Sequence, residues 1–104
     1  MLYCVKIKIP MIRGVIMDKN KMIELFFDGV LTLENTEDCE GFFSDLCTPK
    51  ELQTIAQRFA VAKLLSEGKV YAEIVNATGA STATVSRVNR TMTEATKKAL
   101  EKIG

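Results

Sequence analysis

Residues 70–91 read VYAEIVNATGASTATVSRVNRT, and two short helical patterns lie on either side of a turn within them. Residues 70–78 are able to form a short helix whose inward apolar residue is Ile74. The next three residues, Gly79-Ala80-Ser81, predict a tight turn, because glycine adopts the positive φ that the bend requires and serine is a good helix N-cap. A second helix is expected over residues 82–91. Two short helices joined by a three-residue turn that contains glycine form a helix-turn-helix.

The outer face expected for residues 82–91 has the chemistry of a surface that reads a DNA groove. It lies opposite the inward residues Val85 and Val88 and carries small, hydroxylated and arginine side chains. Small residues allow close approach to base edges, hydroxyl groups can contact either base, and arginine can reach guanine or phosphate. No carboxylate occurs in the sequence between Glu73 and Glu94, as suits a helix placed against phosphates. The candidate DNA-binding residues are Thr82, Ala83, Thr84, Ser86, Arg87, Arg90 and Lys69. The alternative is a plain helical hairpin whose polar side chains are solvated.

The helix before this motif has the clearest start signal in the chain. The run Thr48-Pro49-Lys50-Glu51 combines a capping box with proline at the first helical position. We expect this helix to continue to Glu67, where Gly68 ends it. Its apolar residues recur at helical spacing along one face, and they are Leu52, Ile55, Phe59, Ala62 and Leu65.

Two further helices are predicted nearer the N-terminus, over residues 18–33 and over residues 36–46, the latter with Thr36 as its N-cap. Eight of the twelve residues 22–33 are apolar and lie around most of the first helix, so it must be covered on most sides. A chain of 104 residues has too little material for that, and a second copy is the natural cover. The paired aromatics Phe26-Phe27 and Phe42-Phe43 fit a core and dimer interface, or an exposed patch for another protein.

The expected class is therefore all-α, with about six helices once a final helix at the lysine-rich C-terminus is included. Residues 1–16 fit poorly with the rest and are expected to be a flexible N-terminal arm or an upstream extension. Residues 17–104 are expected to form a single helical domain, with the helix-turn-helix at 70–91.

Composition excludes several other classes. The chain is 47% hydrophobic and 26% charged, as in ordinary globular proteins, and its apolar runs are too short to span a membrane. It has no histidine, the commonest general base and metal ligand, so we expect no enzyme, no metal and no cofactor. Cys4, Cys39 and Cys47 are an odd count at irregular spacing, which favours reduced, mostly buried thiols and a cytoplasmic protein.

The net charge of +1 conceals an asymmetry between the two parts of the chain. Residues 1–67 hold 8 basic and 10 acidic side chains, whereas residues 68–104 hold 6 basic and 3 acidic ones. A basic C-terminal third on an acidic body favours one surface that meets a polyanion, although ordinary surface scatter gives the same count.

Four sequence runs together resemble the tryptophan repressor superfamily in order and spacing. They are LCTPKE (46–51), QRF (57–59), LLSEG (64–68) and GASTATVSR (79–87). The run 79–90 is similar, more closely still, to a group of small Trp-repressor-related proteins, the YerC/YecD-like group. The resemblance implies an intertwined homodimer whose first three helices form a shared core, with residues 70–91 as the DNA-reading head.

The resemblance also implies a small-molecule effector site between the third helix and the recognition helix. Arg58 and Arg87 match the repressor's two ligand-clamping arginines, and Thr48 matches a residue that lines the same pocket. Val88 stands where the repressor has glycine, and its extra carbons in a snug site would clash with an indole. Any effector is therefore expected to be a molecule other than tryptophan. Alternatively, the two arginines pair with Asp or Glu, or bind phosphate directly.

These observations predict a homodimeric transcriptional regulator, such as a repressor, that binds specific double-stranded DNA sequences with its recognition helix in the major groove and is not controlled by tryptophan. The competing hypothesis is a dimeric protein-interaction module of the transcription apparatus that does not read a DNA sequence. The expected partners are double-stranded DNA and a second copy of the chain, with no membrane.

Overall fold

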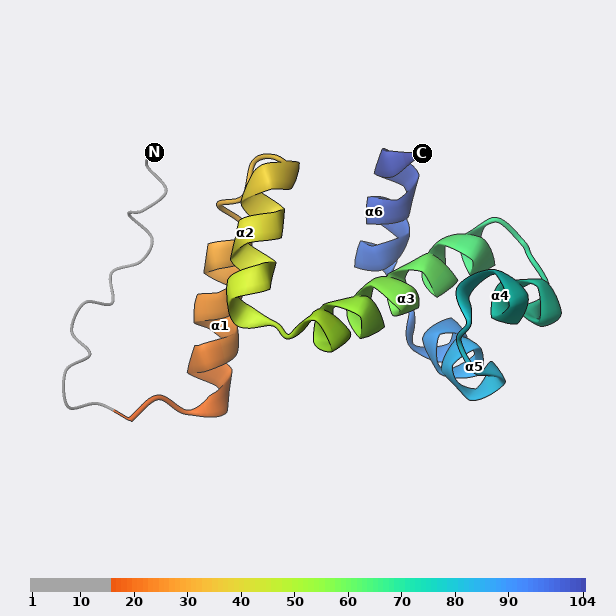
Figure 1. Ribbon diagram of the computed structural model, residues 1–104, viewed down its shortest axis with the longest axis horizontal. Helices are drawn as coiled ribbons and strands as arrows, with labels where there is room; N and C mark the ends of the chain where they lie inside the picture. The colour runs from red at the N-terminus through yellow and green to blue at the C-terminus, as the bar shows by residue number, and fades with distance from the viewer. Residues whose placement is uncertain (1–15) are drawn as a thin grey trace. The chain divides into compact units, whose positions relative to one another are not determined.

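The computed structural model describes residues 16–104, and within them it contains six helices and no strand (Figure 1). The helices are α1 (Lys19–Val30), α2 (Thr36–Leu46), α3 (Pro49–Ser66), α4 (Tyr71–Thr78), α5 (Thr82–Thr91) and α6 (Glu94–Ile103). The predicted all-α class and helix count are confirmed. The chain divides into two compact units, one ending at Asp45 and the other running from Leu46 to Gly104. The expectations for residues 1–15 lie outside the described residues.

In the first unit, local hydrogen bonds fix the helix ends, and two of them correct the sequence prediction. The helix α1 stops at Val30 and does not reach Leu33, because the chain turns there: the Thr32 hydroxyl donates to the Gly29 carbonyl at 2.7 Å. The cap of α2 is Asn35, whose Oδ1 accepts from the Asp38 backbone N–H at 2.8 Å, and the predicted cap, Thr36, is the first residue of the helix. An amide side chain one residue earlier satisfies the same free backbone donors.

Aromatic rings join α1 to α2. The ring centroids of Phe26 and Phe42 are 5.8 Å apart, and those of Phe42 and Phe43 are 5.2 Å apart. Gly29 permits this approach, since a Cβ there would lie 3.2 Å from the Phe42 ring. No residue of α1 or α2 is buried, however, and Phe27 remains 57% exposed.

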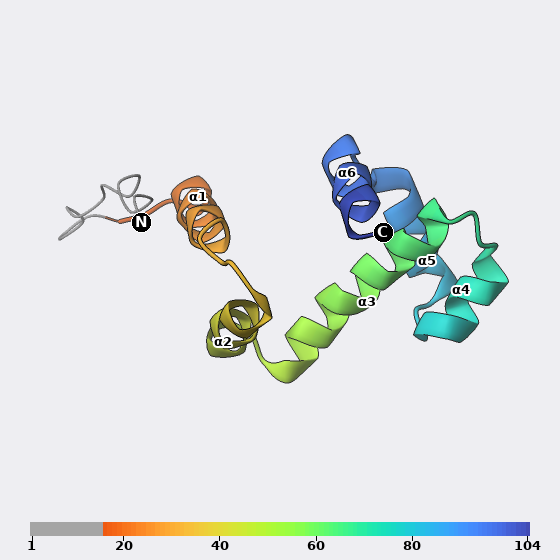
Figure 2. The same cartoon turned by 90° about the horizontal axis from the view of Figure 1, so that it is seen from above.

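In the second unit, α3 provides the platform for the helices that follow it (Figures 1 and 2). Its capping box is formed as predicted: Glu51 N–H donates to Thr48 Oγ1 at 3.1 Å, and Thr48 N–H donates to Glu51 Oε1 at 2.8 Å. The C-terminal half of α3 packs against α4, α5 and α6, and α6 contributes one buried residue, Leu100. The core cluster of this unit is Val61, Ile74, Ala80 and Val85.

The prediction of mostly buried thiols is wrong for the described cysteines. Cys47 is half-buried. Cys39 is exposed, because the helix that carries it has no buried face within its unit. No helix within residues 16–104 combines the length and the apolar character that a membrane crossing needs.

Candidate DNA interface

The helix α5 is held in place by its inner face, where Val85 is fully buried. Val85 on α5 and Ile74 on α4 are both 0% exposed, and they meet Val61 of α3 in one cluster, with Val88 packed against it. The turn before α5 has the predicted conformation, since Gly79 has φ 77° and the Ser81 hydroxyl accepts from the Thr84 backbone N–H at 3.1 Å. Burial and capping therefore fix the direction in which the outer face of α5 points.

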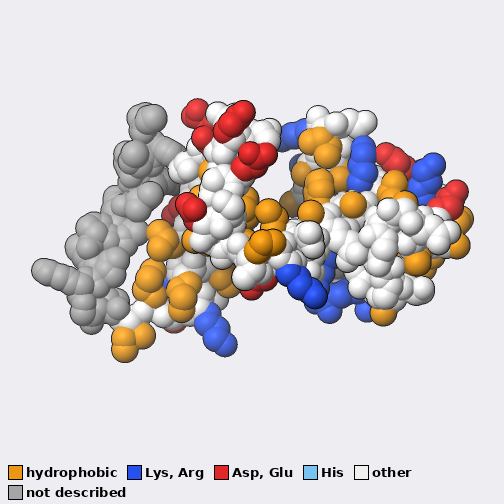
Figure 3. Space-filling view, in the orientation of Figure 1, with side chains coloured by type: hydrophobic (Ala, Val, Ile, Leu, Met, Phe, Trp, Pro, Cys, Tyr) orange, Lys and Arg blue, Asp and Glu red, His pale blue; other side chains and the backbone are white. Residues whose placement is uncertain are grey.

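Four of the seven residues predicted to contact DNA, Ala83, Ser86, Arg87 and Arg90, lie on that outer face, and Thr82 and Thr84 flank it. Thr82, Ala83, Arg87 and Arg90 are exposed, and Thr84 and Ser86 are half-buried. The seventh, Lys69, is exposed but lies in the loop between α3 and α4. In Figure 3, basic side chains gather along the lower edge of this unit.

Two hydrogen bonds order the hydroxyl groups on the outer face. Arg90 Nη1 donates to Ser86 Oγ at 2.9 Å, and Ser81 Oγ donates to Thr84 Oγ1 at 3.1 Å. In both bonds the hydroxyl oxygen on α5 is the acceptor, which leaves its own O–H as a remaining donor.

Two further hydrogen bonds, which the sequence analysis missed, attach the turn and α5 to their neighbours. Gln57 Nε2 on α3 donates to the Thr78 carbonyl at 3.1 Å, and Asn89 Nδ2 on α5 donates to the Tyr71 hydroxyl of α4 at 3.2 Å. The available signal was that Asn89 lies one turn after the buried Val85, on the side of α5 that faces α4. Both bonds restrain the angle at which α5 is presented.

Three of the four residues predicted for an effector pocket line one hollow of about 310 Å³. These three are Arg58, Arg87 and Val88, and the rest of the lining comprises Ile55, Phe59, Ala62, Thr91, Met92 and Thr96. Thr48 is not in the lining, because its hydroxyl caps α3. The ion pair formed within residues 16–104 is Lys63–Glu67, so neither Arg58 nor Arg87 has a carboxylate partner in that part of the chain.

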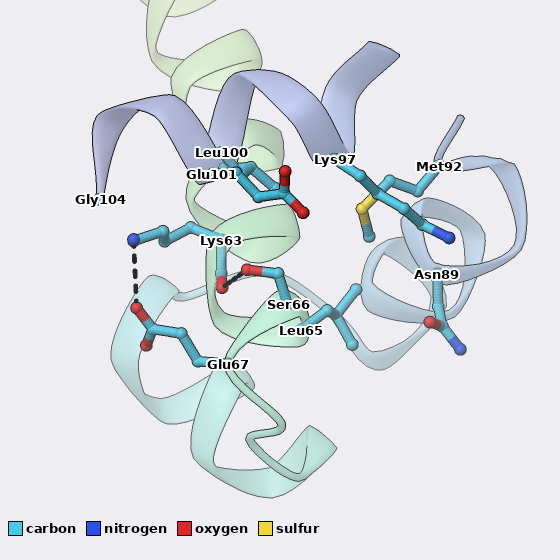
Figure 4. A pocket seen from close by; sticks show the side chains of 10 residues that line it. All are labelled: Lys63, Leu65, Ser66, Glu67, Asn89, Met92, Lys97, Leu100, Glu101 and Gly104. Carbon is cyan, nitrogen blue, oxygen red and sulfur yellow. Dashed lines mark hydrogen bonds and ion pairs between the residues drawn. The ribbon is translucent and has the colours of Figure 1, made fainter. Parts of the chain in front are cut away.

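A second hollow, of about 520 Å³, was not predicted (Figure 4). It lies among the ends of α3, α5 and α6 and has a charged rim, where Lys63 and Glu67 pair at 3.3 Å. Met92 lines both hollows, and Leu100 lines the larger one. Sequence spacing alone could not reveal either hollow, because each needs the path of α6 across α3.

The six helices, and an outer face of α5 that carries no carboxylate, are typical of an all-α protein that binds a nucleic acid. The family model described as Trp repressor protein matches residues 21–103, and the chain belongs to that family. The chain is 49% identical over 72 residues to the uncharacterized protein YerC of Bacillus subtilis (strain 168), an alignment that covers 69% of each protein.

Two solved structures have the same fold. One is a TrpR-like protein from Eubacterium eligens ATCC 27750, which is 39% identical with a TM-score of 0.77 over 83% of this chain and 92% of that one. The other is a candidate Trp repressor from Staphylococcus aureus, which is 42% identical with a TM-score of 0.74 over 85% of this chain and 95% of that one. Membership in this family implies a DNA-binding regulator and not an enzyme.

Proposed function

We propose that the chain is a homodimeric transcriptional regulator that reads a specific double-stranded DNA sequence by placing α5 in the major groove, and that tryptophan does not control it. The observation that carries the proposal is the outer face of α5. Its side chains are neutral hydroxyls, methyl groups and arginines, and the buried Val85 holds the helix from behind. A helix in the major groove needs such a surface, because phosphates flank it on both sides.

Homodimerisation is supported by the apolar surface that each unit leaves uncovered. Met22, Ile23 and Phe27 of α1 are between 50% and 57% exposed, and on α3 Ile55 is 52% exposed and Phe59 is 42% exposed. Soluble chains rarely expose so many large apolar side chains unless another surface covers them. We assign that cover to a second copy of the chain, with residues 17–104 acting as one domain in the dimer.

Independence from tryptophan is supported by the lining of the 310 Å³ hollow. Val88 lies there beside Arg58 and Arg87 and also packs against the core cluster, so its side chain cannot simply move aside. An indole placed against the two arginines would meet this side chain, and overpacking of that kind typically costs about 1–3 kcal/mol. The two arginines, which have no carboxylate partner within the described residues, remain available for phosphate or for a smaller anionic effector.

The proposal is tested by selecting duplex oligonucleotides with the purified chain and measuring affinity for the selected site against salt concentration. We expect the affinity to fall steeply as salt rises, because phosphate contacts release counterions. Replacing Thr84 and Ser86 by Ala should reduce preference for the selected site by about 1–3 kcal/mol per lost base contact, with non-specific binding retained. Ser44→Ala, an exposed serine on α2, is the matched control.

Two outcomes would decide against this function. Selection that enriches no sequence would favour the protein-interaction module. A sequence preference that the double change at Thr84 and Ser86 leaves unaltered would remove α5 as the reader.

A further inference from the structure

On the outer face of α5, one residue orients another. We infer that Ser86 is a positioning residue for Arg90, and that this pair recognises the acceptor edge of a guanine in the major groove. The inference rests on the proposed function and specifies the base chemistry that α5 reads.

The geometry is a hydrogen bond along the helix. Ser86 and Arg90 are four residues apart on α5, so both lie on the same face, and Arg90 Nη1 donates to Ser86 Oγ at 2.9 Å. Arg90 is exposed, and no carboxylate pairs with it within residues 16–104. A long exposed arginine in the last turn of a helix is normally free to reach outward to flanking phosphates. This bond instead draws the guanidinium back one turn, toward the part of the helix that meets base edges in a helix-turn-helix.

The remaining hydrogen-bonding groups of the pair are mostly donors, because the one acceptor left is the second lone pair of the Ser86 oxygen. A guanidinium has five N–H groups and no acceptor, so four remain when one is given to the serine. Because the Ser86 oxygen accepts that bond, its hydroxyl hydrogen is free to point outward. The same holds two residues earlier, where Thr84 Oγ1 accepts from Ser81.

A donor-rich surface selects among the bases by their major-groove edges. Guanine presents two acceptors, O6 and N7, whereas thymine presents one acceptor beside a methyl group, cytosine presents an N4 donor, and adenine presents an N7 acceptor beside an N6 donor. Guanine is therefore the base whose whole edge complements the pair. Holding the guanidinium in place also reduces the rotamer freedom that Arg90 loses on binding, since arginine is among the side chains that lose most on ordering.

The test uses the full chain and the selected duplex. Each guanine of the site is replaced in turn by 7-deazaguanine, which lacks the N7 acceptor. We expect one guanine per half-site at which this replacement weakens binding of the native chain by roughly tenfold, and at which it has little effect on the Arg90→Ala variant. Arg90→Lys should recover phosphate attraction but not the preference for that guanine, because lysine lacks the planar fork.

A double-mutant cycle between Ser86 and Arg90 distinguishes a positioning role of Ser86 from a merely structural one. Ser86→Ala should reduce the preference for the same guanine in the native background and leave it unchanged in the Arg90→Ala background, with the salt dependence unaffected by Ser86→Ala. Lys98→Ala, which removes an exposed cation from α6, is the control and should not alter base preference.

Failure of this inference is distinguishable from failure of the proposed function. If Arg90→Ala weakens binding to all duplexes alike, or if the effects of Ser86→Ala and Arg90→Ala simply add, the pair reads phosphate or acts independently and the inference is wrong. A sequence preference that still depends on Thr84 would leave the proposed function standing. If the native chain shows no sequence preference, both are overturned.

Discussion

The two units of this chain differ in how much of their own apolar surface they bury. The unit of α3 to α6 buries apolar side chains in a core of its own, in which Val61, Ile74 and Val85 are 0% exposed and meet in one cluster. The unit of α1 and α2 is at least as apolar in sequence, yet none of its helical residues is buried, and Ile23 is 50% exposed. Burial of apolar area is the main favourable term in folding, so the first unit lacks a stabilisation that the second already has.

From this difference we infer separate roles for the two units. Contacts within the second unit fix the orientation of α5, as binding in a DNA groove requires. The first unit keeps an aromatic cluster around Phe26 and Phe42, and in the proposed dimer the second copy would cover the outer side of that cluster. Acidic side chains gather over one end of α2 in Figure 3, which makes α2 a poor surface for DNA and leaves the apolar side as the one to be covered.

The largest expected effect comes from placing a charge on the uncovered apolar side. Phe26→Asp should give unfolded or aggregated chains, because in the proposed dimer this position would lie in an interface that is also the core, where an unpaired carboxylate is unfavourable. Sedimentation and circular dichroism measure the result. Lys21→Asp, on an exposed polar position of the same helix, is the control and should remain dimeric.

Sedimentation of the native chain as a well-folded monomer would contradict this prediction. The first unit would then be stable without a cover, and its exposed apolar face would need another explanation.

The next largest effect tests the unit that buries its own surface. Ile74→Ala should lower the free energy of unfolding by about 2–5 kcal/mol, because a fully buried side chain leaves a cavity when it is truncated. Denaturant unfolding at one fixed chain concentration measures it. Ile103→Ala, at a position that is 63% exposed, should change the stability far less. Equal losses at the two positions would show that α6 is covered in the dimer.

A feature of the fold could be predicted from the sequence where neighbouring residues alone determine it. The bounds of α5 follow from a serine cap and a helical pattern that depend on neighbouring residues only. The predicted end of α1 lies three residues beyond the observed one. Apolar spacing continues through Leu33, whereas the hydrogen bond from Thr32 turns the chain before it. Cys39 was misplaced because burial depends on what covers a helix, which its own sequence does not state.

The candidate site divides in the same way. The outer face of α5 was predictable, since spacings of three and four residues place Ala83, Ser86 and Arg90 on one side of a helix. The bond between Ser86 and Arg90 follows their spacing of four but depends on the rotamers that both adopt. The hollow beside Arg58 was reached only through a family resemblance, because it combines side chains of α3, α5 and α6 that no spacing rule brings together.

A smaller effect is expected at two glycines, one in each unit. Gly79→Ala should destabilise by about 1–2 kcal/mol: φ there is 77°, and an added Cβ would meet Gln57 Nε2 only at an ordinary 3.8 Å, so backbone strain is the main cost. Gly41→Ala, within α2, should stabilise by about 0.5–1 kcal/mol, because a Cβ there meets nothing within 4 Å. Unfolding midpoints of both variants measure this. Destabilisation by Gly41→Ala would mean that the partner chain lies against Gly41.

The smallest effect, and the last prediction, is that tryptophan does nothing. The second unit already holds α5 through Val85 and through the bond from Asn89 to Tyr71, so no ligand is needed to set its direction. A ligand can shift the position of α5 only by binding two positions with different affinity, and a molecule that Val88 excludes has no affinity for either. Calorimetry with millimolar tryptophan should therefore show no heat of binding, and DNA affinity should be unchanged. Val88→Gly should restore weak binding at most, because Ile55 and Phe59 also shape the hollow. Micromolar tryptophan binding by the native chain, with tighter DNA binding in its presence, would contradict this and would make α5 the part of the molecule that depends on an outside contact.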